Sequence, residues 1–306
     1  KLAGDDPART NRAVSSVFEL GSVFKPITIA AGIDTGAIRP SDSFDVDEPV
    51  VISGRRISDS HHIPGPLSPA EIVSQSSNIG TVKVAMMLGA RRQQDALESL
   101  GLMERSPVEL AGSADPILPS RFDEIHAATI SYGHGIAVSP LSFAGAFSMF
   151  ANSGEVVEPT LIIDPDKARD VHRVVSAPTA SLVTQMLRDA VLTGTGKQAE
   201  VAGYRVAGKT GTAEKPVPGG YSHSANIASF AAVFPADRPQ YVVLIVLDSP
   251  KAAVGRGRTA AWNAAPTAGR VINRIAPALG VEPYFDDPDR FENPLVRSVA
   301  ERRGAL

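Results

Sequence analysis

Three short polar segments of the chain contain groups that could together carry out nucleophilic chemistry. They are SVFK at 22–25, SSN at 76–78 and KTGT at 209–212. A serine hydroxyl becomes a good nucleophile when an adjacent base removes its proton, and a lysine can be that base. Each segment alone is common by chance, but all three in this order are typical of enzymes that form a serine acyl-enzyme. The sequence therefore indicates acyl transfer through an activated serine.

The first segment supplies the candidate nucleophile and its base. A spacing of three residues puts Ser22 and Lys25 on one helix face, and Ser22 at the helix start lies beside N–H groups that favour an oxyanion. Near its ordinary pKa of about 10.4, roughly one lysine in 2,500 is neutral at pH 7. Burial and a nearby cation such as Lys209 lower a lysine pKa. We expect Lys25 to be a neutral base and Lys209 to stay charged; alone, this pair fits a helix cap and a solvated lysine better.

The second segment contains Ser76 and Asn78 in a turn after a short helix. The Ser76 hydroxyl could pass a proton between Lys25 and the nitrogen that leaves the substrate. The Asn78 side chain could hold the substrate amide. Taken alone, the segment fits an ordinary polar helix end.

The third segment is expected on an edge strand, which can pair with an extended peptide. Gly211 would let the substrate approach the backbone closely, while Lys209, Thr210 and Thr212 offer hydrogen-bond donors to a carboxylate. The backbone N–H groups of Ser22 and Thr212 would form the oxyanion hole. Without the other two segments, a basic β-turn would explain the same residues.

Hydrophobic spacing and turn residues predict the elements that position these segments. Pro26 suits a first helical turn after Ser22, and residues 68–71 form a capping box that starts a second helix. Further helices are expected at 81–88, 91–100, 140–154, 182–191 and 264–279, and strands at 10–18, 204–212, 228–234 and 241–248. Consecutive strands beside helices predict an α+β domain with an antiparallel sheet. Residues 60–155 are expected to form a mainly helical lobe.

Composition excludes several other classes of protein. The 306 residues have a formal net charge of −3, so no global positive field points to nucleic acid as a partner. There is no cysteine, which excludes disulfides, thiolate metal sites and a cysteine nucleophile. The histidines have no metal-ligand spacing, so we expect no metal. No apolar run is long enough for a membrane span, and a start at Lys1 without Met suggests an excised or processed fragment.

The chain also resembles a known family well beyond these motifs. The segments FELGSVFKP, QSSNIG and VAGKTGTAEK are similar to the three active-site segments of class B penicillin-binding proteins. Residues 132–154 resemble the segment between the second and third motifs of that family, and residues 229–251 and 259–283 resemble the C-terminal sheet and helix of its division-specific branch. The resemblance covers roughly residues 10–285. It implies a penicillin-binding/serine β-lactamase-like α+β fold, with an antiparallel five-stranded sheet flanked by helices, a transpeptidase domain over 1–285 and a tail over 286–306.

The resemblance also implies a function and roles for individual residues. It implies a D,D-transpeptidase that cross-links peptidoglycan stem peptides at the septum, is inhibited by β-lactams and needs no cofactor. Ser22 would be acylated, Lys25 would be its base, and Ser76 and Asn78 would line the pocket. The substrate carboxylate would be bound at Lys209, Thr210, Gly211 and Thr212. The parent protein would carry an N-terminal membrane anchor and pedestal, lie at the periplasmic face of the inner membrane and contact divisome membrane proteins.

Two alternative functions remain open at this point. A serine β-lactamase would share the acylation step but needs a base that activates water for deacylation, and no E-x-x-L-N segment is present. A β-lactam sensor or divisome scaffold would bind without turnover, although the complete set of three motifs argues against a pure scaffold.

Overall fold

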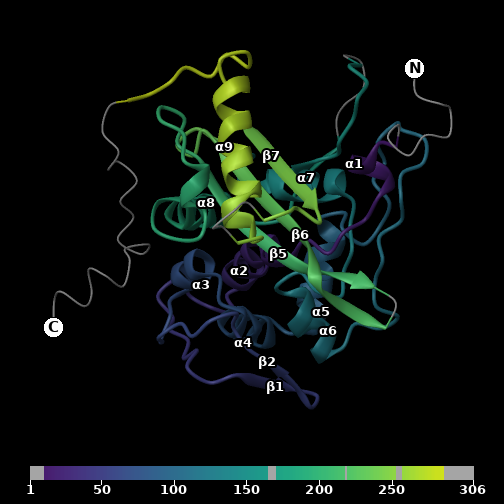
Figure 1. Ribbon diagram of the computed structural model, residues 1–306, viewed down its shortest axis with the longest axis vertical. Helices are drawn as coiled ribbons and strands as arrows, with labels where there is room; N and C mark the ends of the chain where they lie inside the picture. Colours follow the sequence, from purple (N-terminus) through teal and green to yellow (C-terminus); the bar gives the residue numbers. More distant parts are fainter. Residues whose placement is uncertain (1–9, 165–169, 218, 253–256, 286–306) are drawn as a thin grey trace.

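The computed structural model describes residues 10–164, 170–217, 219–252 and 257–285 (Figure 1). Its main sheet is antiparallel, with the strand order β5-β6-β7. Strand β5 (Ala207–Val217) is an edge strand, β6 (Gly220–Phe234) is central, and β7 (Tyr241–Asp248) pairs with its other side. Two short ribbons complete the described strands: β1 (Val50–Ile52) with β2 (Arg55–Ile57), and β3 (Glu155–Val157) with β4 (Val171–Arg173).

Both faces of the central strand are buried over its second half, residues 227–234. Side chains alternate along a strand, and accordingly Ile227, Ala231 and Val233 of β6 join the larger hydrophobic core, whereas Phe230 and Phe234 join a smaller one. The smaller core lies under α9 (Ala264–Ile275), which runs along the sheet in Figure 1. This arrangement is a layered α+β architecture, as predicted.

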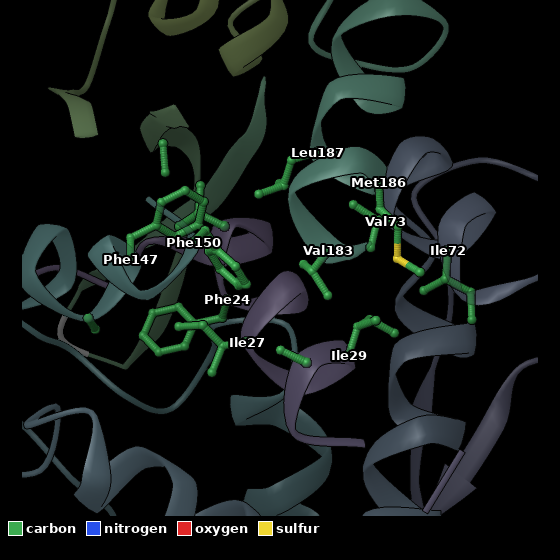
Figure 2. Packing of buried hydrophobic residues seen from close by; sticks show 14 of the residues in the cluster. Phe24, Ile27, Ile29, Ile72, Val73, Phe147, Phe150, Val183, Met186 and Leu187 are labelled. Atoms are coloured by element: carbon green, nitrogen blue, oxygen red, sulfur yellow. The ribbon is translucent and has the colours of Figure 1, made fainter. Parts of the chain in front are cut away.

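The larger core is built mainly from helices. Its centre brings together Phe24, Ile27 and Ile29 from the nucleophile segment with side chains of α3, α8 and the segment at 147–150 (Figure 2). The helices in this part of the chain are α2 (Lys25–Asp34), α3 (Pro69–Gln75), α4 (Asn78–Leu88), α5 (Ala90–Ser99), α6 (Glu124–Ile130), α7 (Pro140–Phe147) and α8 (Ala177–Leu192). The elements between α3 and α7 are all helical, and their division into a separate lobe stays a prediction.

Local signals explain where several of these helices begin. Helix α3 starts with the predicted capping box, in which the Ser68 hydroxyl accepts from Glu71 N and the Glu71 carboxylate accepts from Ser68 N. Helix α7 starts at Pro140 after the cap Ser139. The helical break predicted at Gly89 is confirmed, because this residue separates α4 from α5 at a φ of 86°.

The N-terminal strand predicted at 10–18 is wrong. The short helix α1 (Arg12–Ser15) forms there, because the Asn11 side chain accepts a hydrogen bond from Ala13 N and caps it. Only an isolated bridge from Phe18 to Val138 follows. The main sheet also differs from the five strands that were expected, because it has three strands among the described residues. The tail predicted at 286–306 lies outside the described residues. Within the described residues, no helix is long and apolar enough to cross a membrane.

Candidate active site

The predicted nucleophile Ser22 lies on a tight turn at the start of its helix. A short 3₁₀ helix, η2 (Gly21–Phe24), leads directly into α2. Gly21 has a φ of 65°, and a Cβ there would come within 3.1 Å of the Thr212 carbonyl oxygen. The nucleophile turn is thus packed against the backbone of β5, which brings the backbones of Ser22 and Thr212 to the same place.

Glycines hold this turn from two sides. Gly21 N donates to the carbonyl of Gly133, which belongs to the YGHG segment, at 3.3 Å. On β5, a Cβ at Gly211 would come within 2.2 Å of the Leu20 carbonyl oxygen and 2.4 Å of Ser229 Oγ. The Ser229 hydroxyl donates to that same Leu20 carbonyl at 2.7 Å. Gly211 is therefore required for close packing of β5 against the nucleophile segment, in addition to any approach of a substrate.

The Ser76 hydroxyl joins the two motif lysines. Lys25 Nζ lies 3.2 Å from Ser76 Oγ and also donates to the Ser76 carbonyl. Lys209 Nζ lies 2.9 Å from the same Ser76 Oγ and donates to the Thr210 carbonyl at 3.0 Å. Both lysine side chains are fully buried. The structure thus brings the three sequence motifs into one connected group, with Ser76 at its centre.

The surroundings of the two lysines favour their neutral forms. Burial lowers the pKa of Lys25 well below its usual range, and the positive charge of Lys209 lowers it further, whereas Asp59 acts in the opposite sense. Burial also lowers the pKa of Lys209 to about 7. This lowered pKa is what a neutral base would need, and the role of Lys25 as the base stays a prediction. The lowered pKa of Lys209 means that its surroundings do not hold it permanently charged.

The second motif has an unusual backbone at its reactive residue. Ser76 ends α3 in the left-handed conformation, with φ 64° and ψ 40°. This conformation is uncommon for a residue other than glycine, and such strain concentrates at functional sites. It lets both the carbonyl and the hydroxyl of Ser76 face Lys25. Asn78 begins α4, and its side chain donates to the Ser58 carbonyl at 3.0 Å.

The third motif lies on the edge strand, as predicted. Lys209 and Gly211 pair with Ala231 and Ser229 of β6, which leaves the other edge of β5 without a strand partner among the described residues. The Thr210 hydroxyl is 2.6 Å from that of Thr195. The Thr212 side chain is used structurally, because its hydroxyl accepts a hydrogen bond from Ala260 N at 3.0 Å. Because the Thr212 hydroxyl is the acceptor in this bond, its O–H group can still donate to a carboxylate.

Sequence reasoning missed several residues that border the site. Asp59 accepts hydrogen bonds from the second motif, and Thr195 supports Thr210. On another side, the buried Glu19 carboxylate accepts from the Tyr221 hydroxyl at 3.1 Å and from Gly135 N at 3.2 Å. His134 lies between the Tyr132 and Tyr221 rings, at 5.1 Å and 6.0 Å. Only the position of Glu19 three residues before Ser22 could have drawn attention to this wall.

Burial lowers the pKa of His134, and the charge of Lys25 adds to that effect. The imidazole is therefore neutral beside the lysine pair at neutral pH. No group of three or more potential metal ligands occurs in the described ranges.

Comparison with known proteins agrees with this geometry. Residues 3–272 match the family model described as the penicillin binding protein transpeptidase domain. The chain is 41% identical to a probable peptidoglycan D,D-transpeptidase FtsI of Caulobacter vibrioides, over 90% of this chain and 49% of that protein. It is 33% identical to a probable peptidoglycan D,D-transpeptidase PenA of Neisseria flavescens, over 90% of this chain and 68% of the other. It thus spans about half the length of the first relative.

Solved structures agree in fold. The transpeptidase domain of penicillin-binding protein 3 from Burkholderia pseudomallei superposes with a TM-score of 0.82 at 32% identity, covering 91% of this chain and 84% of that one. Penicillin-binding protein 3 of Mycobacterium tuberculosis, in complex with ampicillin, gives a TM-score of 0.82 at 33% identity, covering 94% of this chain and 67% of that one. With its three motifs gathered around Ser76, the chain belongs to the penicillin-binding protein transpeptidase domain family.

Proposed function

We propose that this chain is a serine D,D-transpeptidase domain that cross-links peptidoglycan stem peptides through a Ser22 acyl-enzyme and is inhibited by β-lactams. The observation that carries the proposal is the Ser76 hydroxyl, which contacts Lys25 at 3.2 Å and Lys209 at 2.9 Å. This hydroxyl is shared by two buried lysines, and one of them, Lys25, lies one helical turn after Ser22. Such a group is suited to moving protons during acyl transfer. Relatives named as peptidoglycan D,D-transpeptidases support the substrate class.

The proposed reaction begins with proton removal from Ser22 by neutral Lys25. The Ser22 oxygen attacks the carbonyl of the peptide bond before the terminal residue, and the backbone N–H groups of Ser22 and Thr212 stabilise the oxyanion. Ser76 returns a proton from Lys25 to the leaving nitrogen, so that the terminal D-Ala departs as an amine and Ser22 carries an ester. The amine of a second stem peptide then attacks that ester, gives up its proton along the same route and regenerates Ser22.

Recognition of the terminal carboxylate is assigned to Lys209 and Thr210, with Thr212 contributing through its backbone. A bound carboxylate would favour the ammonium form of Lys209, whose pKa burial lowers to about 7. Substrate binding would therefore charge Lys209 and, through repulsion, keep Lys25 neutral. Asn78 is assigned to the substrate amide, for which its side chain has a second N–H donor and an acceptor oxygen besides the donor to the Ser58 carbonyl.

For the parent protein, we propose a single-pass anchor that holds this domain at the periplasmic face of the bacterial inner membrane, together with divisome membrane proteins. Support comes from the relatives named FtsI and from the half of the Caulobacter relative that this chain does not match. A fusion of the full-length parent protein to a reporter that is active only in the periplasm tests this location. An inactive reporter would contradict it.

Covalent labelling tests the proposed nucleophile directly. Incubation with a fluorescent penicillin should label the wild-type chain at Ser22, located by peptide mass spectrometry, and Ser22→Ala should remove the label. Ser181→Ala, which removes an exposed hydroxyl on α8, is the matched control and should label normally. An adduct on any other residue, or a label that persists in Ser22→Ala, would exclude the proposed mechanism.

A further inference from the structure

Asp59 lies in the segment after β2 and is bound to the start of α4. Its carboxylate accepts hydrogen bonds from Ser77 Oγ at 2.8 Å, from Asn78 N and from Ile79 N at 3.2 Å. These donors are part of the second motif or follow it directly. A carboxylate at a helix N-terminus satisfies free N–H groups and interacts favourably with the helix dipole. Asp59 therefore fixes the backbone that immediately follows Ser76.

The negative charge of the same carboxylate acts on the buried Lys25. The titratable groups that interact with Lys25 are Lys209 from β5, Asp59, and His134 from the segment after α6. Asp59 raises the pKa of Lys25, in opposition to burial and to the charge of Lys209. Two lysines buried without a counter-charge would be costly whenever either is protonated. An acid at this position makes that protonated state accessible.

We propose that Asp59 is a positioning and charge-balancing residue of the active site, which holds the second motif in place and opposes the loss of the Lys25 proton. This inference rests on the proposed function, because it concerns the base of the same reaction. Asp59 acts without touching the substrate, through Ser77 and Asn78 on one side and through its charge on the other. A purely structural cap would provide the first effect only.

The charge has a direct consequence for catalysis. A general base works best when its pKa is close to the working pH, because a lower value makes it a weaker proton acceptor. By opposing burial and Lys209, Asp59 keeps Lys25 basic enough to take the Ser22 proton while Lys25 remains neutral. Loss of the charge should therefore leave Lys25 neutral over a wider range of pH but make it less basic.

The variant Asp59→Asn separates the two roles, because the amide can keep the hydrogen bonds but not the charge. Its carbonyl can accept from Asn78 N and Ile79 N, and its amino group can donate to the Ser77 hydroxyl. The measurement is the second-order rate constant of acylation by penicillin between pH 4.5 and pH 9. We expect the acid limb of this profile to move to lower pH by on the order of one unit, with a lower plateau.

Asp47→Asn is the matched control. Asp47 lies in the same part of the chain and accepts a hydrogen bond from Gly65 N at 3.1 Å, but it does not bond to the second motif. This variant should keep the wild-type profile. An acid limb that is the same in Asp59→Asn as in the wild type would overturn the charge-balancing role.

The variant Asp59→Glu gives a second test of the charge. If Asp59→Asn does not fold, Asp59→Glu, which keeps the charge on a longer side chain, should retain the wild-type acid limb while lowering the melting temperature. A shifted limb in Asp59→Glu would contradict the inference. Failure of the proposed function is distinguishable, because the wild type itself would then form no adduct at Ser22.

Discussion

Gly133 lies so close to Gly21 that a Cβ atom at position 133 would come within 2.1 Å of the Gly21 carbonyl oxygen. The two residues are 112 positions apart in the chain, and one of them directly precedes the proposed nucleophile. The YGHG segment therefore acts as a backbone support for the nucleophile turn. A glycine is needed at 133 both for this contact and for its φ of 83°.

Gly133→Ala should damage both stability and acylation. The new methyl group meets backbone rather than a flexible side chain, so the Gly21–Ser22 turn must move. Overpacking of this kind costs about 1–3 kcal/mol, and a left-handed alanine about 1–2 kcal/mol more. We expect a loss of unfolding free energy in denaturant titrations and a fall in the rate of penicillin acylation of at least about tenfold.

Gly135→Ala is the control for this prediction. Gly135 has a similar φ of 78°, but its nearest contact for a Cβ is Thr129 Oγ1 at 3.4 Å. This variant should carry only the backbone strain and acylate at close to the wild-type rate. Equal effects at both positions would show that the contact with Gly21 does not matter.

Lys25→Arg should nearly abolish acylation, because arginine keeps its charge at any accessible pH. Loss of general-base assistance costs about 10²- to 10⁴-fold in rate. In the wild type, the acylation rate should rise with pH through an apparent pKa far below the usual lysine value, since burial and Lys209 lower the pKa of Lys25. Stopped-flow acylation between pH 4.5 and pH 10 measures both effects.

Lys215→Arg is the matched substitution for Lys25→Arg. Lys215 lies on β5 and forms an ion pair with Asp248 at 2.7 Å, which arginine can also form. It should preserve the pH profile. A flat wild-type profile, or an active Lys25→Arg variant, would remove Lys25 from the role of base.

The sequence predicted which polar side chains meet at the site, but not the residues that hold them in place. Lys25, Ser76 and Lys209 belong to motifs whose residue types and order are informative, and the structure brings these side chains into contact. Asp59 was missed because it is one of many acids in a loop-rich stretch. No local pattern shows that its partners are Ser77, Asn78 and Ile79, which lie 18 to 20 residues further along the chain.

Elements were predicted well where a long hydrophobic pattern defines them. Strand β7 and the break between α4 and α5 agree with expectation. The segment at 10–18 differs from prediction because it alternates only weakly, whereas the Asn11 side chain accepts a local hydrogen bond from Ala13 N that competes with strand pairing. The number of strands in the sheet depends on pairing between distant segments, which alternation alone does not determine.

Asp189→Asn should stabilise the protein at neutral pH. Burial raises the pKa of Asp189, the charge of Glu71 raises it further, and hydrogen bonds from Thr193 and Ser74 only partly oppose these effects. The folded state thus binds this proton more tightly than the unfolded state, so the stabilising contribution is present at low pH and is lost as the pH rises through the folded pKa. The gain from asparagine should be larger at pH 7.5 than at pH 4.5.

Asp34→Asn is the control, because it should change the free energy of unfolding in the opposite direction. Burial acts to raise the pKa of Asp34, but hydrogen bonds from Ser176 and Thr179 outweigh it, and the net pKa is lowered. Its contribution is present above the unfolded pKa and is lost as the pH falls, so asparagine should destabilise at pH 7.5 and do so less at pH 4.5. Unfolding free energies at the two pH values measure both variants. The same sign at both positions would refute these assignments.

Amidation of the substrate carboxylate should abolish reaction with the isolated chain. Lys209 and Thr210 lie together at the end of the lysine–serine group, with their side chains 3.4 Å apart, and a carboxylate would favour the charged form of Lys209. An amide lacks that charge and offers fewer acceptor sites. Hydrolysis or aminolysis of a thioester analogue with a free or amidated terminus, followed by mass spectrometry, measures the difference. Equal rates would exclude recognition of the carboxylate here.

The penicillin acyl-enzyme should persist for many minutes to hours at neutral pH. Deacylation needs a base aimed at a water on the Ser22 ester, and the carboxylates beside this site are already engaged. Asp59 accepts from Ser77, Asn78 and Ile79, and Glu19 accepts from Tyr221 and Gly135. Without general-base assistance, hydrolysis is slower by about 10²- to 10⁴-fold.

A pulse of penicillin, dilution and timed intact-mass spectra measure this lifetime, with Glu19→Gln as the variant that removes the buried carboxylate three residues before the nucleophile. Its lifetime should equal that of the wild type, because the Glu19 carboxylate is held by the Tyr221 hydroxyl and Gly135 N. The drug fragment that stays on Ser22 would also block the approach of an acceptor amine, so the adduct should resist added amines as well as water. An adduct that clears within seconds, with catalytic consumption of the drug, would make this chain a β-lactamase rather than a transpeptidase.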